Sequence, residues 1–453
     1  MAVNTLDRHA RRAGPARGPL AMAAVFLGLV ACSPQEVPEF QAEQAIIAGA
    51  LDPVAVRTSP LGVEDAVRIG IISSRNVQNS AIAIRQSNNE VIINRALYYP
   101  ELYASASVSA GSTTPVGVEA GLRYTLFDFG ERAAKVDGAI ATVDQSRYAL
   151  FTEIETSAED ILSDYIDFSI ETAGLADARS YVDSIRLLED GVRGRVLIGA
   201  ASEVDTNDFD TSLIRATTEV GNAEAQTAAA RNTLSSALGI SVGSVLSPQQ
   251  IYAQLQTRTG LIADDSLMAH PRYLARQSEI EIARAERNAV AAGLFPAIGV
   301  KLGIGGGLNT DGDFVNNGIV AGPSVSQSFP LGGGRKEAVA NADLAIAIAE
   351  QNLTEELRLL KLEAQNARTA FVNSNQRVEQ LKDVVNISIR TRDIMLGDYE
   401  VGNRALRDLL DAEERIYDAR ADLNEARRVN LQNLTRMIFA YDQASGKLYS
   451  APE

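Results

Sequence analysis

The amino-acid sequence predicts a mainly α-helical protein with a small β part, arranged as two structural repeats. Three observations lead to this fold class. One pattern of residues occurs twice, four short segments alternate between apolar and polar residues, and two apolar registers each continue for about 60 to 65 residues. Helices of that length do not fit compact domains, so we expect this chain of 453 residues to be elongated.

The repeat is defined by residue pairs at one spacing. The pairs 203 residues apart are Arg132 and Arg335, Gly199 and Gly402, Asp205 and Asp408, and Asp208 and Asp411. The prolines before the β segments, Pro100 and Pro296, are only 196 residues apart, so the second copy is longer by about seven residues between its strands. The duplication therefore includes the strands, with a length change that belongs in a loop.

The overall charge argues against one class of partner. Acidic residues outnumber basic residues 58 to 42, which gives a formal net charge of −16. A chain this acidic repels nucleic acid, so we expect no nucleic-acid partner. A hydrophobic content of 46% argues against general disorder.

The first residues have the pattern of an export signal. A basic stretch is followed by an apolar run from Leu20 to Ala31 and then by Cys32, the only cysteine. The sequence Leu29-Val30-Ala31-Cys32 resembles a bacterial lipobox, which implies cleavage before Cys32 and acylation of its thiol. The alternative is a signal peptide cut elsewhere, with Cys32 uninvolved. Ser33, in place of an aspartate, implies sorting to the outer membrane.

The β segments form two predicted hairpins, at 102–126 and 297–329. In the first segment Leu102, Ala104 and Ala106 alternate with serines and Tyr103, and the other segments show the same two-residue period, least cleanly in the fourth. One apolar and one polar face is typical of a water-filled membrane barrel. Soluble hairpins packed on a core are the alternative. Against it, aromatic residues gather at the same end of every strand: Tyr98, Tyr99, Phe127, Phe129, Phe295 and Phe329.

Four strands cannot close a barrel. Open strand edges in lipid leave backbone groups unpaired, at a cost of several kcal/mol each. We therefore expect several chains to share one barrel. Two chains would give eight strands with a filled interior, and three would give twelve strands with an aqueous lumen. The turn at 111–116 and the loop at 306–317 would lie on the extracellular side.

The long helices follow the strands in each copy. After Arg335 apolar residues recur at alternating steps of four and three, which predicts a coiled-coil seam; the first copy shows the same spacing, interrupted by Arg147 and Ser157. At 1.5 Å per residue each helix would span roughly 90 to 100 Å. Shorter helices are expected at roughly 61–97, 202–238, 266–294 and 404–440.

These elements divide the chain into six parts. They are a lipoprotein signal peptide at 1–31, a lipid-anchored extension at 32–60, repeat 1 at 61–239 with a tip turn at 195–205, an equatorial linker at 240–265, repeat 2 at 266–441 with a tip turn at 398–408, and a C-terminal tail at 442–453.

With these features in place, the chain from Leu61 to Tyr441 resembles a TolC-like outer-membrane factor, of the outer membrane efflux protein family and its lipoprotein subclass. The most specific stretch is Tyr399-Glu400-Val401-Gly402-Asn403-Arg404-Ala405-Leu406-Arg407-Asp408-Leu409-Leu410-Asp411-Ala412, which is similar to the second tip motif of that family. The resemblance implies a homotrimer with a twelve-strand barrel and a periplasmic helical tunnel. It also implies a periplasmic adaptor and an inner-membrane transporter as partners, in drug efflux or type I secretion.

The resemblance also assigns candidate site residues. Tyr399 and Arg404 would belong to polar links that close the periplasmic entrance, with Asp205 as an acceptor; an arginine fork suits a carboxylate. Asp408 and Asp411 share a helical face, and threefold symmetry would place six carboxylates around the narrowest opening. The alternative for two aspartates on a helix is a solvated face.

The first tip departs from the family pattern. Val196 stands where the second copy has Tyr399, which leaves the closed-state partner of Asp205 open. Gly199 and Gly402 fit a left-handed turn between antiparallel helices. In the family such tips dock the adaptor.

The sequence offers few groups for catalysis or metal binding. Its histidines are His9, in the leader, and His270, and Cys32 has no second cysteine to join. We therefore expect no enzyme, no metal site and no cofactor apart from the lipid at Cys32. His270 precedes Pro271, which favours a helix start over a ligand role.

Two other kinds of protein compete with an outer-membrane channel. One is a lipid-anchored periplasmic coiled-coil scaffold without a pore, and the other is the adaptor itself. The repeat and the four membrane-type strands argue against the adaptor, and the scaffold would show neither a heat-modifiable trimer nor conductance. Drugs, metals and a secreted polypeptide all stay open as cargo.

Overall fold

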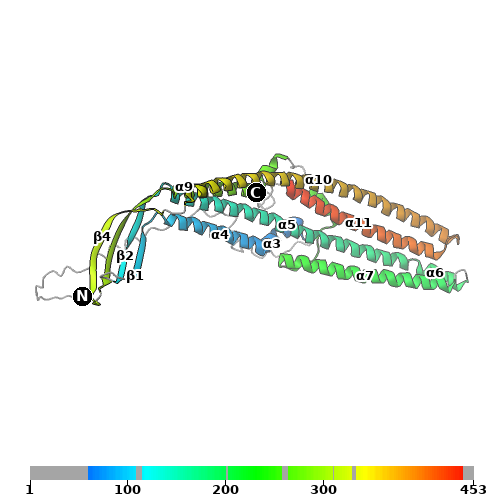
Figure 1. Ribbon diagram of the computed structural model, residues 1–453. Helices are drawn as coiled ribbons and strands as arrows, with labels where there is room; N and C mark the ends of the chain where they lie inside the picture. The colour runs from blue at the N-terminus through cyan, green and yellow to red at the C-terminus, as the bar shows by residue number, and fades with distance from the viewer. Residues whose placement is uncertain are drawn as a thin grey trace, which may run out of the picture. The chain divides into compact units, whose positions relative to one another are not determined.

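The computed structural model describes residues 60–441 apart from 109–114, 200–201, 258–263, 310 and 329–332. The predictions for the signal peptide, Cys32, Phe329 and the tail at 442–453 lie outside the described residues. Within them the chain is mainly helical, with one small sheet at one end of the helices (Figure 1). The predicted fold class is confirmed.

The sheet joins the two repeats. Its strands are β1 (Glu101–Val108), β2 (Val116–Phe127), β3 (Ala297–Leu308) and β4 (Phe314–Ser326), all antiparallel in the order β1-β2-β3-β4. Each repeat supplies one hairpin, and β2 pairs with β3 across the repeat boundary. Within the described residues, β1 and β4 each have one edge without a partner strand.

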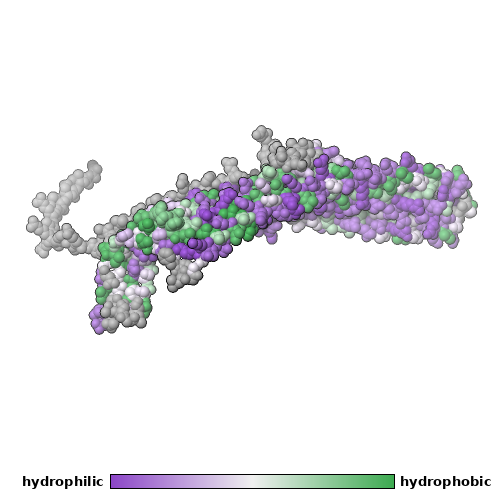
Figure 2. Space-filling view, turned by 45° about the horizontal axis from the view of Figure 1, so that its top comes forward, coloured by the Kyte–Doolittle hydropathy of each residue, from purple (hydrophilic) through white to green (hydrophobic). Residues whose placement is uncertain are grey.

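The strand register places apolar residues in rows on one face. Leu102 pairs with Leu122, which pairs with Leu302, and the row that contains Ile304 is equally apolar. This face is open: Leu102 is 65% exposed, Leu302 51% and Ile304 57%. Hydrophobic residues also gather over the sheet in Figure 2, whereas the helices at the opposite end are largely hydrophilic. An apolar face left uncovered in one chain marks a surface for lipid or for another subunit.

Aromatic rings collect where the strands meet the helices. The ring of Phe129 lies 4.7 Å from those of Phe127 and Phe295. On the first hairpin the Arg132 guanidinium lies 4.6 Å from the ring of Tyr98. The described members of the predicted aromatic group thus share one end of the sheet, as an interfacial girdle requires.

The first repeat contains α3 (Val63–Ser73), α4 (Arg75–Ala96), α5 (Glu131–Arg186), α6 (Glu189–Leu197) and α7 (Glu203–Leu238). Two helices predicted as continuous are broken. The helix expected over 61–97 is interrupted at Ser74, whose hydroxyl caps α4 and lies 3.0 Å from that of Ser157. Ser157, the polar residue that interrupts the apolar register of the long helix, therefore contacts the residue at which the other helix breaks.

The first long helix is also shorter than predicted. α5 has 56 residues, and α6 follows it after a break at 187–188. Leu187 is 83% exposed there, so it contributes nothing to the coiled-coil seam. In the second repeat α10 (Arg335–Glu400) is continuous over 66 residues, close to the predicted length.

The second repeat and the linker complete the chain with α8 (Pro248–Gln256), a 3₁₀ turn η2 (Asp264–Ala269), α9 (Pro271–Ala292) and α11 (Leu406–Tyr441). The helix predicted from 266 starts later, because 264–269 forms the 3₁₀ turn. α4 and α9 both have 22 residues, and their first residues are 196 apart. The 196-residue spacing of Pro100 and Pro296 therefore also relates the two whole helices α4 and α9.

The caps of these two helices are also equivalent. Ser74 Oγ accepts from Val77 N at 3.4 Å, and His270 Nδ1, 196 residues later, accepts from Arg272 N at 3.2 Å. The predicted helix start at His270 is confirmed. Burial lowers the pKa of His270 to about 4, and Arg272 adds to this, so the imidazole is neutral at neutral pH.

An arginine fastens each strand-to-helix junction. Arg132 Nη1 donates to Leu97 O at 3.3 Å and to Thr125 O at 2.9 Å. Arg335 donates to Gly293 O. Leu97 and Gly293 each follow the last residue of a preceding helix, where backbone carbonyls lack helical partners. The repeated pair Arg132 and Arg335 therefore marks a recurring contact.

The linker packs on the middle of the helices. Ile251 of α8 is fully buried, and the Tyr165 hydroxyl donates to Leu61 O at 2.5 Å and accepts from Leu246 N at 3.0 Å. Burial raises the pKa of Tyr165 to about 12. This tyrosine ties the residues just before α3 and the linker to α5.

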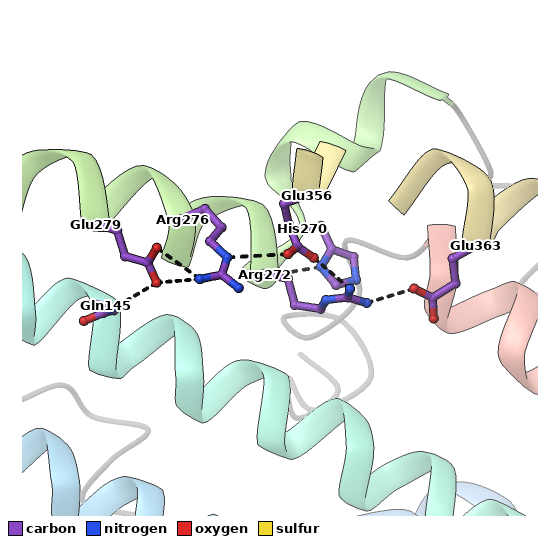
Figure 3. Close-up of polar contacts among 7 residues, drawn as sticks. All are labelled: Gln145, His270, Arg272, Arg276, Glu279, Glu356 and Glu363. Atoms are coloured by element: carbon purple, nitrogen blue, oxygen red, sulfur yellow. Dashed lines mark hydrogen bonds and ion pairs between the residues drawn. The ribbon is translucent and has the colours of Figure 1, made fainter. Parts of the chain in front are cut away.

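A buried carboxylate nearby holds two arginines (Figure 3). Glu356 of α10 is 7% exposed and lies 2.7 Å from Arg272 and 3.5 Å from Arg276. The arginines also pair with Glu363 and Glu279, each at 2.8 Å. A buried charge is tolerated only when it is paired, so this cluster fixes α9 against α10.

Candidate functional site at the helical tips

The two tip turns lie at the end of the helices away from the sheet (Figure 1). Gly199 has φ 71° and Gly402 has φ 82°, a left-handed conformation that favours glycine. The turns share a hydrogen bond, from Gly199 N to Val196 O and from Gly402 N to Tyr399 O, each at 3.0 Å. The backbone of both tips therefore follows the sequence repeat.

One hydrophobic core holds the two tips together. Its members come from both repeats: Tyr181, Val182, Ile185, Leu188, Val192, Phe209, Ala216, Tyr399, Leu406, Leu409 and Leu410. Because α11 buries Leu409, Leu410 and Ala412 here, Asp408 and Asp411 lie on its exposed side. Both carboxylates are thus presented outward from one helical face.

Arg404 bridges the second tip turn. Its guanidinium lies 3.6 Å from the carboxylate of Asp398 and 3.6 Å from that of Asp408, and its side chain is 37% exposed. These pairs connect the end of α10 to the start of α11. Partly exposed ion pairs contribute little stability, so within one chain Arg404 remains available for other carboxylates.

Asp205 caps α7, the helix that follows the first tip turn. Its Oδ2 accepts from Ser202 N at 2.8 Å and from Ser202 Oγ at 3.1 Å, within a capping box at the start of α7. Among the described residues, no hydrogen bond joins Asp205 to Tyr399 or Arg404. The two tips nevertheless influence each other: burial raises the pKa of the Tyr399 phenol, Arg195 opposes this, and Asp205 adds to it.

Arg195 is the tip residue that the sequence did not single out. Its Nη2 donates to Tyr399 O at 2.6 Å and to Glu400 O at 2.8 Å, and its guanidinium lies 4.2 Å from the Tyr399 ring centre. A cation at these carbonyls lies at the C-terminal end of the 66-residue helix α10, where the helix dipole places partial negative charge. An arginine directly before a tip turn was the available signal. The repeat hides it, because the equivalent position holds Asp398.

The seam between the two repeats is polar where α5 meets α11. Arg428 lies 2.5 Å from Glu171, Arg420 lies 3.6 Å from Asp177, and Asn424 donates to Asp177 at 2.8 Å. The seam within the second repeat, between α10 and α11, has a buried apolar stretch, formed by Val378, Val385, Ala419, Leu423 and Ala426. This stretch lies between the Arg392–Glu413 ion pair and the Asn430–Ser374 hydrogen bond. The repeats are therefore joined by directional contacts along the helices and by two apolar cores, one at the tips and a larger one that packs Leu162 and Ile166 of α5 with residues such as Leu431 of α11.

No part of the described chain assembles a metal centre: no group of three or more His, Cys, Asp or Glu residues is placed to hold an ion there. Among the helices that the structure describes, none combines the length and the hydropathy needed to cross a membrane.

Comparison with known proteins identifies a family and two relatives. The family model for the outer membrane efflux protein matches residues 71–240 and 263–441, more than half of the chain. Nodulation protein T of Rhizobium leguminosarum bv. trifolii is 24% identical over 390 residues, 80% of this chain and 81% of that protein. Protein CyaE of Bordetella pertussis is 24% identical over 280 residues, 59% of each chain.

Solved structures share the fold at low sequence identity. The open state of the MtrE outer membrane channel of Neisseria gonorrhoeae has a TM-score of 0.68 and 17% identity, covering 84% of this chain and 88% of MtrE. The outer membrane protein VceC of Vibrio cholerae has the same TM-score at 15% identity, covering 84% and 95%. CusC, which forms a transmembrane channel, also scores 0.68, at 16% identity and 84% and 91% coverage.

Proposed function

The chain belongs to the outer membrane efflux protein family, and from this premise we propose that it forms the outer-membrane exit duct of a tripartite pump or a type I secretion system. The duct conducts its cargo passively from the periplasm to the exterior. Energy comes from an inner-membrane transporter, reached through a periplasmic adaptor that docks at the tip turns around Gly199 and Gly402.

One observation carries this proposal: the sheet is incomplete. Four strands with an exposed apolar face and two unpaired edges need partner strands, because unpaired backbone groups are costly in lipid. Three chains would supply twelve strands and leave an aqueous lumen. A pore-less scaffold or an adaptor would gain nothing from such a sheet.

The tips supply the proposed gate. Asp408 and Asp411 would line the narrowest opening in the trimer, and Arg404 and Tyr399 would hold the entrance closed, with Asp205 as an acceptor between chains. The exposure of the two aspartates and the partial exposure of Arg404 support these roles. The lipid proposed at Cys32 would anchor the chain to the outer membrane.

The test is the purified full-length protein in planar lipid bilayers, together with its mass in detergent. We expect a trimer that conducts ions with a preference for cations, and Asp408→Ala with Asp411→Ala should weaken that preference. Asp418→Ala with Asp422→Ala, at two exposed residues further along α11, is the charge-matched control. A monomer without conductance would refute the proposal.

The cargo class needs a separate experiment. Deletion of the gene should either sensitise the cell to toxic compounds or abolish export of a polypeptide. The first result identifies an efflux duct and the second a secretion duct, and a strain with neither defect would count against both.

A further inference from the structure

A row of charged residues crosses the polar face of the sheet. Glu101 on β1 pairs with Arg123 on β2, and Arg123 pairs with Lys301 on β3. Residues directly opposite each other on neighbouring strands share one face. All three side chains are exposed, so the row faces open space in the single chain.

Glycines show that this face is the concave one. A Cβ atom on Gly299 would lie 2.6 Å from Tyr124 O, and one on Gly121 or Gly307 would also collide with the neighbouring strand. All three glycines point to the same face as Arg123 and Lys301, because they are an even number of residues away along their strands. Neighbouring strands therefore bend toward this face, which would line the lumen of a closed barrel.

The row carries a net positive charge when the ion-pair partners of its two cations are counted. Arg123 lies 3.8 Å from the carboxylate of Glu101 and 5.1 Å from the ring of Tyr103. The Tyr103 hydroxyl donates to Glu119, a second carboxylate of the face, which keeps its negative charge and lies four residues before Arg123 on β2. Within the described residues, Lys301 has no ion-pair partner. Two cations and one carboxylate give this row a net charge of +1 per chain, whereas the four charged residues of the face, with Glu119, sum to zero; the positive charge is therefore local to the row and is carried by Lys301.

We propose that this row is an anion-attracting band inside the barrel and that Lys301 is its main determinant. The inference rests on the proposed function, since only a closed barrel turns the concave face into a lumen. In a trimer three ammonium groups would surround the lumen of the barrel. The carboxylates of Asp408 and Asp411 lie at the tips, at the opposite end of the helices. The duct would then meet its cargo with opposite charges at its two ends. Solutes that bear phosphate or carboxylate groups would be held at the barrel.

The test measures ion selectivity of the full-length protein in planar bilayers under a KCl gradient. We expect Lys301→Glu to lower the ratio of anion to cation permeability about two- to fivefold at 0.01 M salt, where the Debye length is about 30 Å. At 1 M salt, with a Debye length of about 3 Å, the difference should vanish. Lys361→Glu, at an exposed lysine of α10, is the matched control and should leave the ratio unchanged.

A second readout uses block by a multivalent anion. Inorganic pyrophosphate added from the barrel side should reduce the conductance of the wild type more than that of Lys301→Gln, a variant without reversed charge that also serves if Lys301→Glu does not insert. If the pore conducts but Lys301→Glu has the wild-type ratio of anion to cation permeability, the band is refuted and the duct is not. The same holds if pyrophosphate blocks the wild type and Lys301→Gln equally. Absence of any wild-type conductance would overturn both.

Discussion

The two copies of the repeat agree where the backbone sets the requirement and differ where side chains join the copies. Both tips turn on a glycine with positive φ, and both strand-to-helix junctions use an arginine. In contrast, Arg195 faces the end of α10, whereas its equivalent is Asp398. The difference shows that duplication preserved local geometry while the contacts between copies specialised.

The largest effect is expected from a substitution that disrupts the hydrophobic core at the tips. Phe209 of the first tip is fully buried, and the equivalent position in the second copy holds the small residue Ala412. We expect Phe209→Ala to destabilise the tips by about 3–5 kcal/mol, through lost burial and the cavity left behind. Amide hydrogen exchange at the tips would measure this loss. The exposed Ile214→Ala on the same helix is the control. Equal protection of the tip amides in both variants would show that buried Phe209 stabilises the tips no more than an exposed residue does.

The next effect concerns the middle of the helices. Glu356→Gln should cost about 2–3 kcal/mol, since it removes a buried charge that two partly exposed arginines share. The equivalent Glu153 of the first copy is only half-buried, so Glu153→Gln should cost little. Thermal unfolding of both variants compares the copies directly. A smaller loss in Glu356→Gln than in Glu153→Gln would refute the importance of burial.

A smaller effect is expected at Arg195. Arg195→Ala should destabilise the end of α10 by about 2 kcal/mol, because two carbonyls lose a charged donor and the Tyr399 ring loses its cation. The readout is faster hydrogen exchange in residues 397–403. Arg193→Ala, whose side chain is 53% exposed, serves as the nearby control. Unchanged exchange in the Arg195 variant would show that the two tips are held by their core alone.

The smallest effect is a pH dependence of stability. It is expected for the helix cap His270 and not for the equivalent cap Ser74. The pKa of His270 is lowered to about 4 in the folded chain, so its neutral form adds stability above pH 6.5, and this stability is lost as pH falls from 6.5 toward 4. The groups acting on its charge are Arg272, Glu356, Glu363 and Glu155. Between pH 7 and pH 5.5 we expect a loss of about 1 kcal/mol.

His270→Asn should retain the cap and flatten this part of the pH profile, whereas Ser74→Ala should lower stability by a similar amount at both pH values. Thermal unfolding at pH 7 and pH 5.5 would compare the variants. An unchanged pH profile in His270→Asn would exclude the imidazole as its source.

Specific residues show how far sequence reasoning reached. The spacing of Gly199 and Gly402 located both turns, and the alternation around Leu102 and Leu302 gave the apolar face of the sheet. Ser157 was visible as an interruption, but its meaning required the break at Ser74, which lies 83 residues earlier and 3.0 Å away. Arg195 was invisible as a contact, because its partners are carbonyls that any sequence could supply.

The sequence by itself determined the repeat, the element types, the family and the residue types exposed at the tips. These follow from periodicity and from glycine and proline positions, which act within a few residues. The tertiary structure decided which helices break, which cations meet which helix ends, and which face of the sheet is concave. Such features arise when segments tens to hundreds of residues apart are packed together, and the local pattern of neither segment contains them.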